Sequence, residues 1–302
     1  MHKHILRALP LLAALALLAT TGCSRKAEPE PSAAPSIQPT ATVAAPIAET
    51  ESATSWAPVC FAGPFDYSYQ DACRAVAIRR FEQNGIVYFV ADVQLSTADG
   101  FRTQIADSGT ATLTELVSDC DAVLAINADD YGVHKYGTII HNGTLLRAHE
   151  TTRSMLIVDA NGDLHVRVDR SGEDPQALGE ELLAQGVRQS FEFGPELVRD
   201  GQPMAFPSDF DLISTSPSRR EPRTAIGQIG ELHYAIVVAD GRQEDYSIGM
   251  TLPELQQIFV ALGAQTAMNL DGGGSSELWF RGQILNSPCN GAEHSLSDVL
   301  YF

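Results

Sequence analysis

The segment Ala267–Ser276 gathers the residue types of this chain that are best suited to chemistry. Its second half reads Asp271, Gly272, Gly273, Gly274, Ser275 and Ser276. Because glycine lacks a Cβ, a ligand can approach the main chain closely, and successive free N–H groups beside the two serines would form an anion-binding concavity. The sequence therefore predicts a functional site around the Asp271 carboxylate, with a plain glycine-rich hairpin as the structural alternative. No lysine follows the glycines, so the segment is not a Walker A loop.

Strands are expected to position this glycine turn. Apolar residues on both sides of it predict a buried strand before the turn and a second strand after it. Further apolar runs at 86–93, 122–127 and 232–239 predict buried strands, and the pair Asn142-Gly143 predicts a hairpin turn within 138–147. Strand ends are common places for functional side chains, because they are mounted on a rigid scaffold.

The clearest helix is predicted over residues 251–262. Thr251 can cap its first turn, Glu254 occupies the capping-box position, and Gly263 follows its last residue. Together with the strands, this pattern predicts an α+β fold. We expect a single strand-rich domain with a mixed sheet and a few helices, placed after a signal peptide and a disordered tether.

The N-terminal part of the chain is expected to serve export. Lys3 and Arg7 precede a short apolar run, which is typical of a signal peptide and too short for a membrane span. A small residue and a glycine before Cys23 resemble a bacterial lipobox. We therefore expect residues 1–22 to be a lipoprotein signal peptide and Cys23 to carry lipid; the alternative is ordinary secretion with cleavage near Ala19.

Residues 23–55 are rich in Pro, Ala, Thr and Ser and lack hydrophobic periodicity, which predicts a flexible tether. Residues 56–302 are then long enough for one large domain. The expected location is the bacterial cell envelope, with membrane attachment through the lipid on Cys23 and the domain in the periplasm or at the cell surface.

Four further cysteines suggest disulfide bonds in an exported protein: Cys60, Cys73, Cys120 and Cys289. Three connectivities are open. The pair Cys60–Cys73 is plausible locally and would leave Cys120 with Cys289. A metal site is less favoured, because no Cys-x-x-Cys pair or histidine cluster accompanies these residues.

The formal net charge of −18 argues against nucleic acid as a partner. An anionic substrate would have to be attracted by particular arginines against the overall field. The candidates are the cluster Arg219, Arg220 and Arg223, together with Arg153.

A series of short segments along the chain carries a family resemblance. In order they are Ala125–Asn127, Phe193–Val198 with Asp200-Gly201, Pro222–Gly227, Val238–Arg242, Leu252–Leu262, Gly263-Ala264 and Asn269–Ser276. Their order resembles the phosphodiester glycosidase family over about residues 75–302, most specifically in the glycine motif and in Arg-Thr-Ala-Ile-Gly at 223–227. That family includes a lysosomal enzyme that removes N-acetylglucosamine from phosphodiester-linked mannose, and many exported bacterial proteins described as exopolysaccharide-related.

This chain departs from the family pattern in two segments. Family members often carry Asn-Gly and two aromatic residues where this chain has Asn127-Ala-Asp-Asp-Tyr131. Ala128 and Asp130 would alter the pocket wall and the substrate preference. Near the C-terminus, His294 stands where an arginine is expected before the segment Ser295–Asp298.

The resemblance implies cleavage between a sugar's anomeric carbon and a phosphodiester oxygen. Such chemistry needs a cation beside the phosphate, and Arg223 is the first choice because a guanidinium matches phosphate oxygens; its alternative is a pair with a structural carboxylate. It also needs a carboxylate to support the oxocarbenium-like centre or to activate water. Asp271 is the leading candidate, followed by Asp240 and Asp129, although Asp240-Gly241 also reads as a plain turn. The leaving phosphate is a stable anion, so a strong general acid is not required.

Several other residues are expected to bind the substrate: Asn127, Asp129, Thr224, Asn269, Gly272, Gly273, Gly274, Ser275 and Ser276. Asn127 and Asn269 would suit hydrogen bonds to sugar hydroxyls or to Asp271, or a capping role within the loop. No cofactor is certain, and a divalent cation held by Asp129, Asp130 or Asp271 is left open. His134, His141 and His149 match no metal motif and are interpreted as surface residues.

Three functions fit this sequence. The first is an exported hydrolase of glycosyl phosphodiesters, similar to N-acetylglucosamine-1-phosphodiester bonds, in cell-envelope or exopolysaccharide metabolism. The second is a non-catalytic lipoprotein that binds glycans or phosphoglycans on the same scaffold. The third is a phosphodiesterase that breaks the P–O bond with the same residues.

Overall fold

The structure is a computed structural model that describes residues 64–168, 170–206 and 216–302. These residues belong to one compact unit. The predicted signal peptide, Cys23, the tether and Cys60 lie outside the described residues and stay predictions. None of the described helices is long and apolar enough to cross a membrane.

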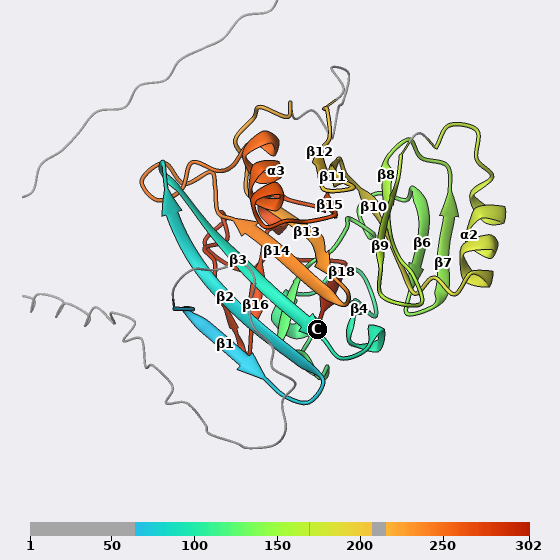
Figure 1. Cartoon of the computed structure of the whole chain (residues 1–302), viewed down its shortest axis with the longest axis horizontal. Coiled ribbons are helices and arrows are strands. Elements are labelled where there is room, and N and C mark those ends of the chain that lie inside the picture. The colour runs from blue at the N-terminus through green and yellow to red at the C-terminus, as the bar shows by residue number, and fades with distance from the viewer. Residues whose placement is uncertain (1–63, 169, 207–215) are drawn as a thin grey trace, which may run out of the picture. The chain divides into compact units, whose positions relative to one another are not determined.

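An eight-stranded sheet is the largest part of the fold (Figure 1). Across the sheet its strands are β1 (Tyr67–Gln70), β2 (Arg74–Gln83), β3 (Ile86–Leu95), β14 (His233–Ala239), β13 (Arg223–Gly230), β15 (Thr266–Asn269), β11 (Glu196–Arg199) and β12 (Gln202–Pro203). Every neighbouring pair is antiparallel. The apolar runs at 86–93 and 232–239 form its central strands β3 and β14, as the sequence predicts.

Both faces of this sheet are covered, because successive strand residues point to opposite sides. In β14, Tyr234, Ile236 and Val238 belong to one buried cluster, whereas Ala235 and Val237 belong to a second one. The near-continuous apolar character of β14 thus reflects burial on both faces.

Helix α3 (Leu252–Ala261) covers the second face, with Leu255 and Phe259 fully buried there. Thr251 accepts a hydrogen bond from the N–H of Glu254, and the Glu254 side chain accepts one from the N–H of Thr251. This capping box satisfies two N–H groups at the start of the helix. The predicted helix is therefore confirmed to within a residue at each end.

A five-stranded sheet packs on the first face. Its strands in order are β17 (Gln283–Ile284), β16 (Leu278–Phe280), β5 (Leu124–Asn127), β18 (Asp298–Tyr301) and β4 (Arg102–Ile105). Ile126, Leu278 and Leu300 join Tyr234 of the large sheet in one buried cluster. The outer face of the small sheet packs against the short helix α1 (Leu113–Leu116).

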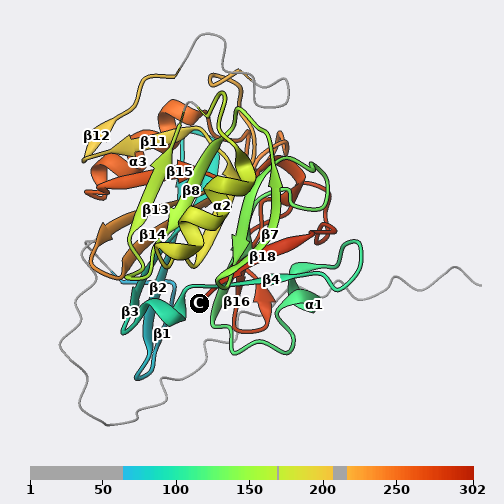
Figure 2. The same cartoon turned by 90° about the vertical axis from the view of Figure 1, so that its right-hand side faces the viewer.

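A third part of the fold combines two small sheets and a helix. It contains the three-stranded sheet β10 (Gln189–Phe193), β8 (Ser154–Val158) and β9 (Leu164–Arg167), the hairpin β6 (Gly137–His141) with β7 (Thr144–His149), and α2 (Pro175–Ala184). Figure 2 shows α2 lying over this hairpin. Asn142 and Gly143 both have positive φ angles, 49° and 74°, which confirms the predicted hairpin turn.

The strand-rich α+β character is confirmed, with few helices and two short 3-10 turns, η1 (Ala98–Gly100) and η2 (Gly273–Ser275). The described strands pair antiparallel throughout. The region that connects the two larger sheets is where the glycine turn lies.

Candidate active site

The glycine turn, residues 271–276, joins two different sheets. β15 ends at Asn269 in the eight-stranded sheet, and β16 begins at Leu278 in the five-stranded sheet. The predicted strand, turn and strand are confirmed. The two strands do not pair with each other, so the turn is a crossover and not a simple hairpin. Residues 271–275 of the turn keep part of their surface exposed.

The main-chain N–H groups of the turn are largely used within the protein. Gly272 N donates to the side chain of Asp271 at 2.8 Å, and Gly273 N donates to the carbonyl of Pro222 at 2.9 Å. The N–H groups of the two serines donate to carbonyls of the turn itself. The expected row of free N–H groups is therefore wrong, and an anion at this turn would have to be bound mainly by side chains.

The buried side chain of Asn127, at the end of β5, holds both ends of the turn. Its Nδ2 donates to the carbonyl of Asp271 at 2.6 Å, and its Oδ1 accepts from the N–H of Glu277 at 3.3 Å. Thr224 of β13, also buried, donates its hydroxyl to the same Oδ1 at 2.7 Å. Asn127 and Thr224 thus fix the main chain around Asp271, and their amide and hydroxyl groups are occupied by that task.

The carboxyl group of Asp271 lies among protein atoms, although the residue keeps some exposed surface. Burial, together with the charge of the nearby Asp130 carboxylate, raises the pKa of Asp271 to about 6. A hydrogen bond from Ser275, the N–H of Gly272 and the charge of Arg153 lower it. At neutral pH this carboxyl group is thus mostly ionised but close to its protonation point.

Arg153 and Asp130 form an ion pair beside Asp271. Nη1 of Arg153 lies 2.9 Å from both carboxylate oxygens of Asp130, and Nε2 of His134 lies 3.3 Å from Asp130 Oδ2. Arg153 directs only this one nitrogen at Asp130, and its guanidinium also lies 5.3 Å from the centre of the Phe193 ring. The site therefore combines two carboxylates and one guanidinium within electrostatic reach of each other.

Asp129 takes part in a buried pair of carboxyl groups with Asp298 of β18. The two side chains share a hydrogen bond, and burial raises the pKa of Asp129 to about 7 and that of Asp298 well above the usual range. Two carboxyl groups in such contact cannot both be ionised without strong repulsion, so the pair holds a proton at neutral pH. Apart from this contact with Asp298, Asp129 Oδ1 has no hydrogen-bond partner among the described residues.

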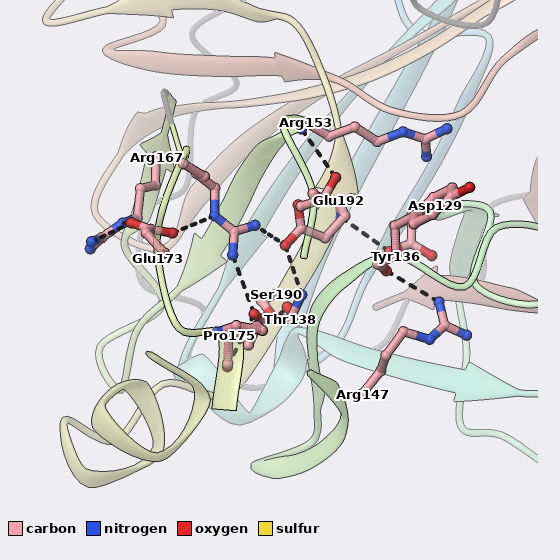
Figure 3. Close-up of polar contacts among 12 residues, drawn as sticks. Asp129, Tyr136, Thr138, Arg147, Arg153, Arg167, Glu173, Pro175, Ser190 and Glu192 are labelled. Carbon is pink, nitrogen blue, oxygen red and sulfur yellow. Dashed lines mark hydrogen bonds and ion pairs between the residues drawn. The ribbon is translucent and has the colours of Figure 1, made fainter. Parts of the chain in front are cut away.

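Glu192 of β10 continues this network (Figure 3). Its N–H donates to Asp129 Oδ2 at 3.1 Å, and its Oε1 accepts from the N–H of Thr138 at 2.9 Å and pairs with Arg170. Burial raises the pKa of Glu192 to about 7 in spite of this arginine. The buried acid network therefore reaches from the vicinity of Asp130 into the third part of the fold.

His141 was interpreted as a surface residue, and this is wrong. Only 4% of His141 is exposed, and its Nε2 lies 4.0 Å from Asp298 Oδ2. Burial and the charge of Arg147 lower the pKa of His141 to about 3, so its ring is neutral. The hydrophobicity of the residues around His141 did not indicate its burial, because the pattern of a short strand does not show which face is buried.

Asp240 is held in a separate hydrogen-bond network. Its Oδ1 accepts from Asn286 Nδ2 at 2.9 Å and from the N–H of Ser287 at 3.0 Å, and its Oδ2 accepts from the Tyr246 hydroxyl at 3.1 Å. Asn286 also donates to the carbonyl of Ser276 at 2.9 Å. Burial raises the pKa of Asp240. Asp240 reaches the glycine turn only through Asn286, so its position suits a scaffold.

Arg223 is 5% exposed and directs its guanidinium at main-chain carbonyls. Its Nε donates to the carbonyl of Met250 at 3.1 Å, and its Nη2 donates to the carbonyl of Arg219 at 2.9 Å. Burial, together with the charges of Arg242 and Arg219, lowers the pKa of Arg223 to about 10, against the opposite effect of Glu221. Its geometry therefore supports the loop around residues 219–223 that leads into β13.

Three other buried side chains lie in or next to the turn with hydrogen-bonding capacity to spare. Asn269 donates its Nδ2 to the carbonyl of Gly194 at 2.8 Å, but its Oδ1 has no partner among the described residues, and the same holds for the hydroxyl of Ser276. Glu277 is fully buried, accepts a hydrogen bond from the N–H of His294, and leaves Oε2 unpartnered. Burial raises the pKa of Glu277 to about 7.

The structure thus brings Asn127, Thr224 and the glycine turn together with Asp271, and it adds Asp130 and Arg153. Asp129 belongs to the neighbouring acid network, while Asp240 and Arg223 support the surrounding loops. Sequence reasoning did not single out Asp298, Glu192 or Glu277. The altered segment 293–298 was a partial signal for Asp298, whereas no local pattern marks the other two.

Disulfide bonds were expected with three connectivities left open, and for the described cysteines this expectation is wrong. Cys73, Cys120 and Cys289 are free thiols. Cys120 packs beside the outer face of the small sheet, whereas Cys289 lies near Gly273. An even number of cysteines carries no information on which of them meet in space, and the positions of Cys120 and Cys289 in the fold keep them apart.

No three His, Cys, Asp or Glu side chains come together in the described ranges in an arrangement that would hold a metal ion. Two surface hollows of about 630 and 380 Å³ were found, and neither is lined by residues of the glycine turn. The candidate site is therefore assigned from its side-chain chemistry.

Comparison with solved structures places the fold. The catalytic domain of zebrafish N-acetylglucosamine-1-phosphodiester alpha-N-acetylglucosaminidase, auto-inhibited by its pro-peptide, aligns with a TM-score of 0.58 at 19% identity, over 76% of this chain and 82% of that one. A protein of Burkholderia pseudomallei K96243, classed provisionally as exported, aligns with a TM-score of 0.51 at 14% identity, over 72% and 74% of the two chains. At these identities the likeness concerns the fold alone.

Sequence comparison adds a relative and a family. The prophage-derived, uncharacterized protein YomE of Bacillus subtilis (strain 168) is 34% identical over 123 residues, which are 39% of this chain and only 18% of that relative. The family model of the phosphodiester glycosidases matches residues 120–302, which include Asn127, the glycine turn and β18. The chain belongs to the phosphodiester glycosidase family.

Proposed function

We propose that this protein is an exported hydrolase of glycosyl phosphodiesters. It would cleave bonds similar to those of N-acetylglucosamine-1-phosphodiesters, in the cell envelope or in exopolysaccharide metabolism. One observation carries the proposal. Asp271 is a partly exposed residue with a carboxyl group of raised pKa on the turn between two sheets, beside the Arg153–Asp130 ion pair, in a chain of the phosphodiester glycosidase family. Carboxylate and guanidinium are the two groups that this reaction requires.

The reaction breaks the bond between the anomeric carbon and the phosphate oxygen, and water adds to the sugar. The ionised Asp271 stabilises the developing positive charge at the anomeric carbon or accepts a proton from the attacking water. Arg153 balances the phosphate, which leaves as a monoester anion with little need for protonation. The products are a free sugar and a phosphate monoester.

The remaining residues have supporting roles in this proposal. Asn127 and Thr224 position the main chain of Asp271, and Arg223 and Asp240 position the loops beside the turn. The partly exposed residues Gly272, Gly273, Gly274 and Ser275 contact the substrate, and the buried Asn269 and Ser276 support the turn beneath it. Asp129 contributes through the protonated pair with Asp298.

The leader sequence supports the proposed location. We infer a lipoprotein signal peptide at 1–22, a lipid on Cys23, a tether to residue 55 and a catalytic domain at 56–302. A tether of this kind would let the domain act away from the membrane surface.

The deciding experiment is hydrolysis of UDP-N-acetylglucosamine and of a simple N-acetylglucosamine 1-phosphodiester by the full chain, in water labelled with oxygen-18. We expect free sugar that carries the label, and loss of this product in Asp271→Asn but not in Asp107→Asn, which alters an exposed carboxylate. An arm with EDTA tests for a divalent cation.

Other outcomes would overturn the proposal. Label in the phosphate would show P–O cleavage, and a wild-type rate in Asp271→Asn would exclude that residue as the catalytic carboxylate. Binding of both compounds without turnover would favour a glycan-binding lipoprotein.

A further inference from the structure

A second set of arginine side chains lies beside the glycine turn, next to Gly273. Arg219, Arg223 and Arg242 surround Glu221, and we refer to these four residues as the Glu221 cluster. Arg219 Nε lies 2.7 Å from Glu221 Oε1, and Arg242 Nε lies 2.5 Å from Oε2. Arg223 lies within electrostatic reach of the other three.

The Glu221 cluster has an excess of positive charge. Three guanidinium groups share one carboxylate, which leaves two positive charges uncompensated within the cluster. The chain as a whole has a net charge of −18, so carboxylates are abundant, yet within residues 64–168, 170–206 and 216–302 no second one is paired with these arginines. An arginine excess that also lies beside a glycine turn matches the usual way in which proteins bind phosphate or carboxylate.

Arg242 is held over the turn by an unusual backbone. Its φ angle of 60° lies in the left-handed region, which non-glycine residues seldom adopt and which concentrates at functional sites. A Cβ on Gly273 would lie 2.9 Å from Arg242 Nη2, so a side chain at this position would displace the guanidinium from its place on the turn. About half of the side chains of Arg242 and Arg219 remains exposed, 48% and 57%, so a ligand can reach both.

The Glu221 cluster lies at a different place from the proposed site of the scissile phosphate. The side chains whose charges act most on Asp271 are Asp130 and Arg153, and no arginine of the cluster acts comparably. The glycine turn thus carries one guanidinium near its carboxylate at residue 271 and another on residue 273. A ligand that spans the turn would place one anionic group beside each of these two guanidinium groups.

We propose that the Glu221 cluster binds a second anionic group of the substrate, so that the substrate is a glycosyl phosphodiester with at least one further phosphate or similar anion. This inference rests on the proposed function. A nucleoside diphosphate sugar and a polymer of repeating glycosyl phosphodiesters both carry such a group.

The test compares kcat/KM for three substrates of the full chain: a methyl phosphodiester of N-acetylglucosamine with one anionic group, UDP-N-acetylglucosamine, and a dimer of glycosyl phosphodiester repeats. In the double variant Arg219→Gln/Arg242→Gln, we expect the preference for a two-anion substrate over the one-anion substrate to fall at least about tenfold, as for a lost charge-assisted hydrogen bond. The two-anion substrate that shows the fall identifies the source of the second anion.

Arg220→Gln is the matched control. It removes the same charge next to Arg219, but Arg220 pairs with Glu254 and lies outside the cluster. We expect it to keep the wild-type preference. An equal loss for all three substrates in the double variant, or the same fall in Arg220→Gln, would overturn the inference.

Direct binding of pyrophosphate, measured by calorimetry, separates this inference from the proposed function. Binding by the wild type that weakens at least about tenfold in the double variant supports the anion site even if no substrate is hydrolysed. Hydrolysis of the one-anion substrate without any effect of the double variant on pyrophosphate binding would leave the function standing and refute the second site.

Discussion

Asn127 donates a hydrogen bond of 2.6 Å to the main-chain carbonyl of Asp271, 144 residues further along the chain. The same amide accepts from the N–H of Glu277 and from the hydroxyl of Thr224. One buried side chain of the small sheet therefore fixes the crossover to the large sheet and, with it, the direction of the Asp271 carboxylate.

Replacement of Asn127 should therefore affect both stability and activity. Asn127→Ala leaves the buried carbonyl of Asp271 and the buried hydroxyl of Thr224 without their partner, at a cost of about 1–3 kcal/mol for each group. We expect a lower free energy of unfolding in urea and a loss of hydrolysis beyond that explained by unfolding. Asn161→Ala, at an exposed position, is the control and should change the free energy of unfolding by less than about 0.5 kcal/mol. Equal stability of the two variants would contradict this role of Asn127.

The pH dependence of hydrolysis should report the ionisation of Asp271. Because burial raises the pKa of Asp271 to about 6 and the reaction needs the ionised form, kcat/KM should rise with pH through about 6 and then level off. The positive charge of Arg153 lowers this pKa, so Arg153→Gln should shift the rising limb to higher pH in addition to weakening phosphate binding. Arg188→Gln removes an arginine paired with Asp99 and should leave the limb in place. If the rising limb of the pH profile stayed in place in Arg153→Gln, the charge of Arg153 would not act on the ionisation of Asp271.

A side chain at Gly273 should be unfavourable for two distinct reasons. Its φ angle of 63° disfavours any other residue, and an added Cβ would meet Arg242. Gly263, at the end of α3, has a φ angle of 76° but open space around it, so Gly263→Ala carries only the backbone cost of about 1–2 kcal/mol. We expect Gly273→Ala to lose a similar free energy of unfolding and, unlike Gly263→Ala, to lose activity. Similar activity in the two variants would mean that the contact with Arg242 has no functional effect.

The free energy of unfolding should fall as the pH rises from about 4 to about 7. Burial raises the pKa values of Asp129, Glu192 and Glu277 to about 7, so between their unfolded values and this pH the folded protein binds more protons than the unfolded chain. Their stabilising protonation is fully present below about pH 4 and is lost as the pH passes through about 7. Urea unfolding at pH 5 and pH 8 measures the difference.

Asp298→Asn removes one partner of the buried acid pair and should reduce this pH dependence, because Asp129 then no longer faces a second carboxylate. Asp107→Asn alters an exposed carboxylate and should leave it unchanged. Stability that increases from pH 5 to pH 8 in the wild type would show that these acids are ionised at little cost.

The elements next to the site were predictable from local patterns. The apolar runs at 86–93 and 232–239 are long enough to indicate buried strands, and Thr251 with Glu254 marks the start of α3 through contacts only three residues apart. The glycine turn was equally visible, since its flanking apolar residues define strands on either side. In each case the forces that form the element act between close neighbours in the sequence, so the sequence alone determines them.

Contacts between distant segments were decided by the tertiary structure alone. The turn's N–H groups are satisfied by Pro222 and by the turn itself, Asp240 bonds to Asn286, and Cys120 and Cys289 remain apart. A carboxylate, an amide or a thiol has no local preference that identifies its partner, because its energy depends on which groups share its burial. The sequence by itself therefore determined the family, the strands and the position of the glycine turn. Only the packing of the two larger sheets and the third part of the fold decided that Arg153 and Asp130 lie beside Asp271, because burial and charge at that turn come from segments more than a hundred residues away in the chain.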